Sequence, residues 1–174
     1  MKIKSDITNE SLSANDTDIV KWGPTYATGI PSIDNQHKEL VDLTNKLYHA
    51  CLNRKEDMDT TFKTAMSRLV EYVRYHFSDE QTLLKRIKFP NYMEHKKEHN
   101  DLIKEILEAA KKYSAGISIV PNQFVRTLKD WIFGHIAVLD KVYADFVLDQ
   151  RARGLLGDLF TPNTKGNPPK NKPS

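Results

Sequence analysis

Four stretches of this sequence repeat apolar residues every three or four positions, and this repeat limits the possible folds more than any other feature. The stretches cover about residues 32–53, 59–87, 91–116 and 121–139. Such spacing places the apolar side chains along one face of a helix. The sequence therefore predicts four amphipathic helices, the third of which opens at Asn91 as an N-cap.

Residues that interrupt helices are few in the middle of the chain. The 174 residues include seven Gly and eight Pro, and about half of these lie near the two ends. The links between the four stretches are short, and short links make successive helices antiparallel. The expected fold is all-α, an up-down-up-down four-helix bundle. Val142 and Phe146 continue the last stripe, so the fourth helix ends either near Leu139 or beyond Phe146.

The two ends of the chain differ from its middle. Residues 1–20 are polar and show no apolar periodicity, which predicts a flexible N-terminal arm. Residues 154–174 are basic and rich in Pro, Lys and Asn, which predicts a disordered C-terminal tail. We expect residues 21–153 to form the bundle, with Trp22 and Tyr26 from its first loop covering the core.

Charge and cysteine content exclude several classes of protein. The net charge is +3, but residues 151–174 carry five Lys or Arg and one acid, so the first 150 residues sum to −1. A bundle without a basic face is not expected to bind nucleic acid. Cys51 is the single cysteine, which fits a reducing compartment. No apolar run is long enough to span a membrane, so we expect a cytoplasmic protein.

Histidines and acids occupy positions of the apolar stripes where leucines are expected. Five of the six histidines lie there, and two of them have a carboxylate close by on the same helix. A step of four residues brings two helical side chains to nearly the same face. The seven residues are His37, His76, Glu80, His95, His99, His135 and Asp140.

Bound metal is the partner that satisfies all seven side chains together. One histidine on an apolar face is usually a hydrogen-bonded core residue, but five imidazoles and two carboxylates inside one bundle are costly without a partner. Seven ligands are too many for one tetrahedral zinc ion and suit two ions that share carboxylates. Imidazole suits iron, zinc, copper or nickel, and the carboxylates favour iron or manganese.

Two positions test this interpretation of the spacing. His49 lies twelve residues after His37, so it points about 120° away on the same helix and should be a surface residue. Asp140 lies five residues after His135, which turns it about 140° off the shared face of an ideal helix. Either the helix ends or is distorted between these two residues, or Asp140 is not a ligand.

The motifs resemble those of the hemerythrin family, in particular the single-domain bacteriohemerythrins. The matching segments are WGPTYATGIPSIDNQHKEL, HFSDE, HKKEH and WIFGHIAVLD, and the similarity covers about residues 22–145. The resemblance implies a non-haem diiron centre, with two irons per chain and a bridging oxo or hydroxo group. It places His95, His99 and His135 on one iron.

The resemblance also assigns the remaining ligands and the partner. His37 and His76 would hold the second iron, with a position left open for dioxygen, and Glu80 and Asp140 would bridge the two irons. Gln81 stands where a second acid often follows the ligand Glu, at a position that is not a ligand in the family. Five apolar residues are expected near the oxygen side, where they would exclude water: Leu40, Phe77, Trp131, Ile132 and Ile136.

Reversible dioxygen binding, as an oxygen carrier, store or sensor, is the function that these expectations favour. A diiron redox enzyme, such as an oxidase or peroxidase, is an alternative, but only His49 is left over as a spare histidine. An interaction module that reports oxygen or iron is a further alternative. We therefore expect a protein that is not an enzyme, with dioxygen as its partner.

Overall fold

The computed structural model describes residues 18–52, 58–116 and 121–156. These residues form helices and no strands, which confirms the all-α prediction. The elements are α1 (Pro31–Leu52), α2 (Met58–Arg86), α3 (Tyr92–Ser114), α4 (Pro121–Gly134), the π-helical turn η2 (His135–Leu139) and α5 (Asp140–Ala152).

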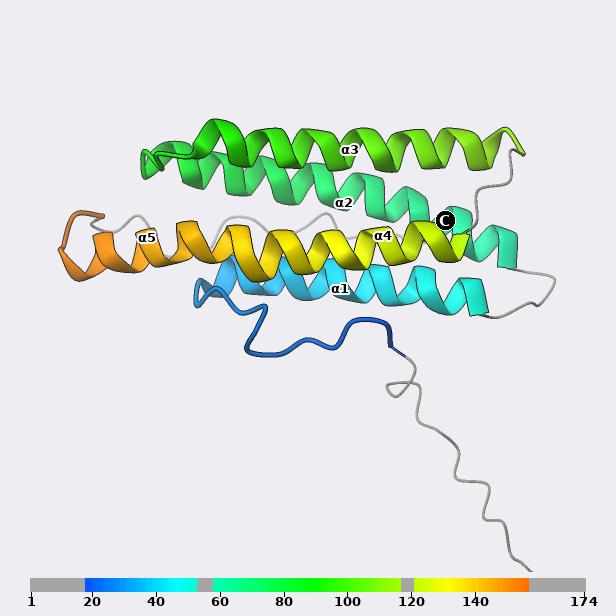
Figure 1. Cartoon of the computed structure of the whole chain (residues 1–174), viewed down its shortest axis with the longest axis horizontal. Helices are drawn as coiled ribbons and strands as arrows, with labels where there is room; N and C mark the ends of the chain where they lie inside the picture. Colours follow the sequence, from blue (N-terminus) through cyan, green and yellow to red (C-terminus); the bar gives the residue numbers. More distant parts are fainter. Residues whose placement is uncertain (1–17, 53–57, 117–120, 157–174) are drawn as a thin grey trace, which may run out of the picture.

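Antiparallel rods lie side by side (Figure 1), and they are α1, α2, α3 and the succession of α4, η2 and α5. The fourth rod consists of α4, η2 and α5 in direct succession, so the fourth helix continues past Phe146. The closest neighbours are α1 with α2, α2 with α3, and α1 with α4. This is the expected up-down-up-down bundle. No helix in the described part of the chain is both long and apolar enough to cross a membrane.

The start of α1 is fixed by its own sequence. Pro31 is the first helical residue, where its missing N–H costs nothing. The Asp34 carboxylate accepts hydrogen bonds from the backbone N–H and hydroxyl of Thr28, at 2.6 and 2.7 Å, and from the backbone N–H of Gly29 at 3.1 Å. These bonds hold the preceding loop against the helix and so orient its first turn, which leads to His37.

The link between α2 and α3 is a tight turn. Lys88 adopts a left-handed conformation with φ of 54°, and the backbone N–H of Phe89 donates to the carbonyl of Leu84 at 2.9 Å. Asn91 precedes α3 as predicted, but its side chain makes no capping hydrogen bond. The prediction was right about the position and wrong about the cap, because the backbone of Asn91 (φ −93°, ψ 27°) is not extended.

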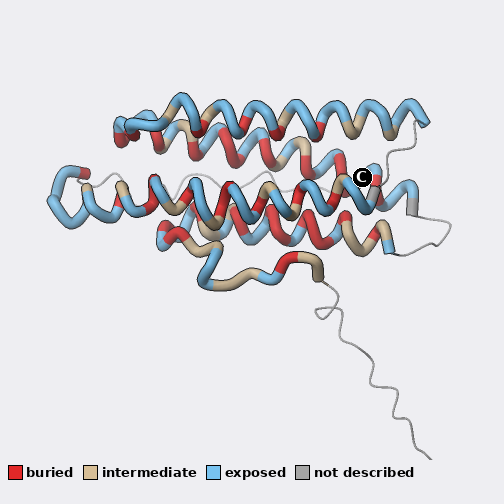
Figure 2. Tube along the Cα trace, viewed as in Figure 1, coloured by how far each residue is buried: buried red, intermediate tan, exposed pale blue. Residues whose placement is uncertain are grey.

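Buried residues follow the inward face of each rod (Figure 2). They form two apolar clusters on either side of the seven polar residues, with Leu47 and Leu69 in one and Leu84 and Val147 in the other. The apolar clusters make the bundle rigid, and they leave a polar layer between them in which metal-capable side chains are held.

Two residues just outside the predicted bounds of the bundle, 21–153, pack against it. Val20 was placed in the arm, yet it is buried, and Asn45 of α1 exchanges two hydrogen bonds with its backbone, at 3.1 and 2.9 Å. Leu156 was placed in the tail, yet it packs in the second apolar cluster. The segment GLLGDLF, which contains Leu156, left packing on the bundle or on a partner open, whereas Ile19 and Val20 are too short an apolar run to show periodicity. The remainder of the predicted arm and tail, 1–17 and 157–174, lies outside the described residues.

Candidate metal centre

The seven side chains predicted as ligands meet inside the bundle. Each rod contributes at least one of them, and all seven are buried, with at most 5% of any residue exposed. They are His37 from α1, His76 and Glu80 from α2, His95 and His99 from α3, His135 from η2 and Asp140 from α5.

Glu80 joins the three histidines of α3 and η2 in one group. Its Oε2 atom lies 3.1 Å from Nε2 of His99 and 3.6 Å from Nε2 of His95. The Nε2 atoms of His99 and His135 are 2.8 Å apart. One ligand atom from each of these four residues lies within 4.8 Å of the others, close enough to surround a single ion.

Glu80 also belongs to a second group, with His37 and Asp140. Nε2 of His37 lies 3.1 Å from Oδ2 of Asp140, and the three ligand atoms are within 4.8 Å of one another. Nε2 of His76 lies 3.9 Å from Oε2 of Glu80. The other oxygen of Asp140, Oδ1, is 3.2 Å from Nε2 of His135. Each carboxylate therefore lies between histidines of both groups, as a bridging ligand must.

The π-helical turn explains how Asp140 reaches the cluster. The backbone N–H of Asp140 donates to the carbonyl of His135, five residues earlier, instead of four. The wider turn takes up one extra residue and rotates Asp140 back onto the inward face. Of the two possibilities that the spacing left open, the helix is distorted and Asp140 faces inward.

Unsatisfied polar atoms concentrate in this cluster. Buried ligand atoms without a hydrogen-bond partner are Nε2 of His37, His76 and His95 and both carboxylate oxygens of Glu80 and Asp140. A buried polar atom without a partner costs free energy, and so many in one place are not tolerated without a reason. Lone pairs that converge without partners are the donor set that metal ions require, so the residues present fit a metal centre.

Burial keeps most of these imidazoles neutral. It lowers the pKa of His37 from 6.5 to about 4 and that of His76 to about 3, and it lowers the pKa of His135 well below its usual value. A neutral imidazole has a free lone pair, which is the form that binds metal.

The two carboxyl groups shift in opposite directions. Burial raises the pKa of Glu80, but the adjacent imidazoles of His95, His99 and His76 outweigh burial and hold that pKa well below its usual range. Burial and the nearby charge of Glu80 raise the pKa of Asp140 well above its usual value. Two carboxylates this close repel each other, and a cation between them removes the repulsion.

Gln36 holds His76 in place from the far side of its ring. The amide oxygen of Gln36 lies 2.9 Å from Nδ1 of His76, and its amide nitrogen donates to Asp79 at 3.0 Å. The hydroxyl of Tyr72 donates to the backbone carbonyl of Gln36 at 2.8 Å. Such partners fix which ring nitrogen is free and where it points.

Two further neighbours of the cluster lie near α3. The amide nitrogen of Gln81 is 3.3 Å from Nδ1 of His99. Tyr143 is fully buried, its hydroxyl has no hydrogen-bond partner, and its ring centre lies 5.6 Å from that of His95. Sequence reasoning missed the contacts of Gln36, Gln81 and Tyr143. The available signal was their position, next to His37, next to Glu80 and three residues after Asp140.

The five apolar residues expected around the centre are placed against it or in the adjoining core. Leu40, Phe77, Ile132 and Ile136 are buried, and Trp131 is partly buried. The Phe77 ring stacks on His99 with 3.7 Å between ring centres, and the Trp131 ring stacks on His135 at 4.2 Å.

His49 lies outside the cluster, as predicted. Its side chain is 32% exposed, and its Nε2 atom is 2.7 Å from the carboxylate of Asp18. The phase of the first helix, taken from the spacing of His37 and His49, is therefore correct.

Comparisons with known proteins agree with this geometry. A sequence model of the hemerythrin HHE cation binding domain matches residues 28–147. A bacteriohemerythrin of Methylococcus capsulatus is 31% identical over 68% of this chain and 88% of its own. One of Pseudomonas aeruginosa is 32% identical over 72% of this chain and 80% of its own.

A solved structure has the same arrangement of helices. The crystal structure of a wild-type hemerythrin superimposes with a TM-score of 0.68 at 27% identity, and the match covers 73% of this chain and 96% of that one. The match to the domain model over most of the chain, together with a relative 32% identical over 72% of it, establishes the family. The chain is a member of the hemerythrin family of HHE cation-binding domains.

Proposed function

We propose that this protein binds dioxygen reversibly at a non-haem diiron centre held by the seven buried residues. The observation that carries the proposal is the pair of ligand groups that share Glu80 and converge with unsatisfied lone pairs. His95, His99 and His135 would hold one iron, His37 and His76 the other, and the two carboxylates would bridge them. A bridging oxo or hydroxo group would complete the proposed centre.

The donor set favours reversible binding over oxidation of a substrate. Two ferrous ions held by these residues would supply the electrons that dioxygen takes up. Diiron bundle sites with four Glu and two His donate more negative charge than five neutral imidazoles and two carboxylates. Less anionic donation stabilises highly oxidised iron less, and the neutral state of His37, His76 and His135 follows from their burial.

The surroundings suit a ligand as small as dioxygen. The seven ligands are almost completely buried, so a bulky substrate could not reach them without displacing core side chains. Leu40, Phe77, Ile132 and Ile136 are buried, and together with Trp131 they would exclude water from the bound gas. Dry, apolar surroundings control which species reach a metal site and how easily its oxidation state changes.

Anaerobic purification with metal analysis, followed by optical spectra, tests the proposal. We expect two irons per chain and a charge-transfer band that appears when dioxygen is admitted and fades when it is removed. Two irons with irreversible oxidation would favour a diiron redox enzyme or a sensor. A different metal, or none, would contradict the diiron centre.

A further inference from the structure

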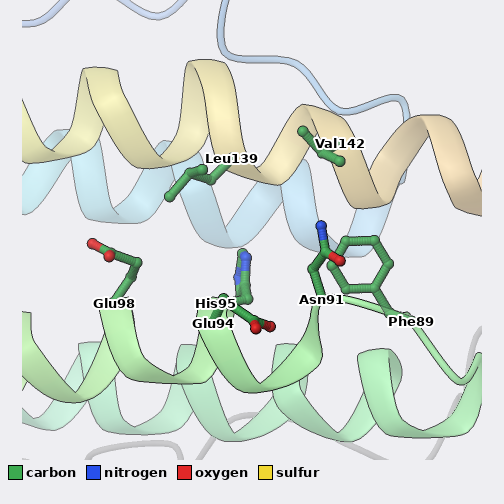
Figure 3. A pocket seen from close by; sticks show the side chains of 7 residues that line it. All are labelled: Phe89, Asn91, Glu94, His95, Glu98, Leu139 and Val142. Atoms are coloured by element: carbon green, nitrogen blue, oxygen red, sulfur yellow. The ribbon is translucent and has the colours of Figure 1, made fainter.

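A cavity opens between α3 and the segment of the fourth rod formed by η2 and α5. Its volume is about 160 Å³. Figure 3 shows Leu139 and Val142 facing the α3 side chains across this gap. The lining residues are Phe89, Asn91, Glu94, His95, Glu98, Leu139 and Val142. α3 and the fourth rod are not among the closest helix pairs, which leaves room for the cavity.

His95 separates this cavity from the ligand cluster. The residue lines the cavity although only 5% of it is exposed. Its Nε2 atom has no hydrogen-bond partner and lies 3.6 Å from a Glu80 oxygen and 3.5 Å from an Asp140 oxygen. A single imidazole ring therefore stands between the cavity and the buried carboxylates.

Two exposed carboxylates flank His95 on the same face of α3. Glu94 and Glu98 are four residues apart, so they lie one helical turn from each other beside the cavity. Neither forms an ion pair with a described residue, and the lining contains no Lys or Arg. The Asn91 side chain, which does not cap the helix, adds another polar group to the cavity wall.

Stability of the helix does not account for both acids. Glu94 lies in the first turn of α3, where a negative charge interacts favourably with the helix dipole. Glu98 lies one turn further, where this effect has faded. Carboxylates are ligands that hard divalent cations prefer, and two acids at a cavity whose lining contains no Lys or Arg concentrate cations at its mouth.

We propose that this acidic cavity is the route by which a divalent metal ion reaches and leaves the buried cluster. Glu94 and Glu98 collect the hydrated cation at the surface, and His95 is the first buried ligand that it meets. The route differs from the apolar surroundings of Ile132, which suit a neutral gas. The inference rests on the proposed iron centre, and it concerns the rate of loading rather than the final occupancy.

The rate of Fe²⁺ uptake by the metal-free protein, mixed under anaerobic conditions, tests this route. The variant Glu94→Gln/Glu98→Gln should load about 3- to 10-fold more slowly at low salt, with a smaller difference at high salt, because steering by charge is screened. Its equilibrium iron content should equal that of the wild type. The matched control, Glu105→Gln/Glu108→Gln, removes the same charge from exposed positions of α3 outside the cavity lining and should load at the wild-type rate.

A second variant narrows the cavity without changing its charge. Val142 is 50% exposed, so Val142→Phe can be accommodated, and it should slow both Fe²⁺ uptake and its release to a chelator. Equal loading by wild type, Glu94→Gln/Glu98→Gln and Val142→Phe would overturn the route. If Val142→Phe slows dioxygen association but leaves iron uptake unchanged, the cavity is a path for gas, and the proposed metal route is overturned. A wild-type protein without iron at equilibrium would instead refute the proposed centre itself.

Discussion

Asp140 and His135 are five residues apart in one continuous rod, yet Oδ1 of the first lies 3.2 Å from Nε2 of the second. The π-helical turn between them makes this contact possible, since an α-helix would direct the two side chains to different faces. The extra residue in the turn thus places the Asp140 carboxylate among the ligands of the candidate metal centre.

Loss of His76 should remove one metal position. In His76→Ala the Nε2 atom beside Glu80 is absent, so we expect iron to fall from two per chain to one or fewer, and the dioxygen-dependent band to disappear. Metal analysis and optical spectra of the anaerobically purified variant measure both. Normal reversible oxygenation in His76→Ala would contradict the proposed ligand set.

His49 provides a histidine control for that substitution. His49→Ala breaks the contact with Asp18 but touches no residue of the cluster. The iron content and the spectrum should match those of the wild type. Loss of iron in this variant would show that removal of a histidine outside the cluster also disturbs metal binding. Loss of iron in His76→Ala would then no longer identify His76 as a ligand.

Gln36 should tune metal affinity through His76. Removal of the partner of a ligand histidine typically weakens metal binding by about 10- to 100-fold. We expect Gln36→Ala to weaken binding by that amount, because the 2.9 Å contact with Nδ1 of His76 is lost. Gln36→Glu retains an acceptor oxygen and should retain most of the affinity. Competition with a chelator of known affinity measures the difference, and equal affinities in both variants would exclude this role for Gln36.

Ile132 should protect the oxygenated protein. The residue is fully buried, and Ile132→Ala should speed autoxidation several-fold because water reaches the centre more easily. The truncation should also lower the free energy of unfolding by about 2–5 kcal/mol. Ile132→Leu keeps the volume and serves as the control. Equal decay rates of the oxygenated band in Ile132→Ala and the wild type would remove Ile132 from the pocket.

Replacing His37 should change how the stability of the metal-free protein depends on pH. Burial lowers the pKa of His37 from 6.5 to about 4, so between these pH values the unfolded chain binds a proton there and the folded chain does not. The wild type therefore loses up to about 3 kcal/mol at this position as the pH falls through that window.

The comparison with His37→Leu isolates this contribution. Asp140, whose pKa is raised, has the opposite pH dependence, but it is present in both proteins. The variant should therefore gain stability relative to the wild type as the pH falls from 6.5 towards 4. Chemical denaturation of both metal-free proteins across this window measures the difference, and parallel curves would refute the prediction.

Helix periodicity was enough to predict the bundle and to bring six distant side chains, five histidines and Glu80, into one layer. It could not predict the π-helical turn, because spacing alone leaves both a distorted helix and an outward-facing Asp140 possible. Contacts such as Gln36 with His76 depend on how α1 and α2 are set against each other, which single-helix patterns do not contain. Single-helix patterns also do not show the burial of Val20, whose backbone forms two hydrogen bonds with the side chain of Asn45 on α1.

The cluster also ties together parts of the chain that are remote in sequence. His37 and Asp140 belong to one ligand group, although about a hundred residues separate them. An ion held by both would act as a cross-link, and closing a loop of that length removes about 4–5 kcal/mol of conformational freedom from the unfolded chain in the entropic model of cross-links. Heating the metal-loaded protein would then release its ions and unfold its helices in one cooperative transition. Metal loss and unfolding would have the same midpoint temperature.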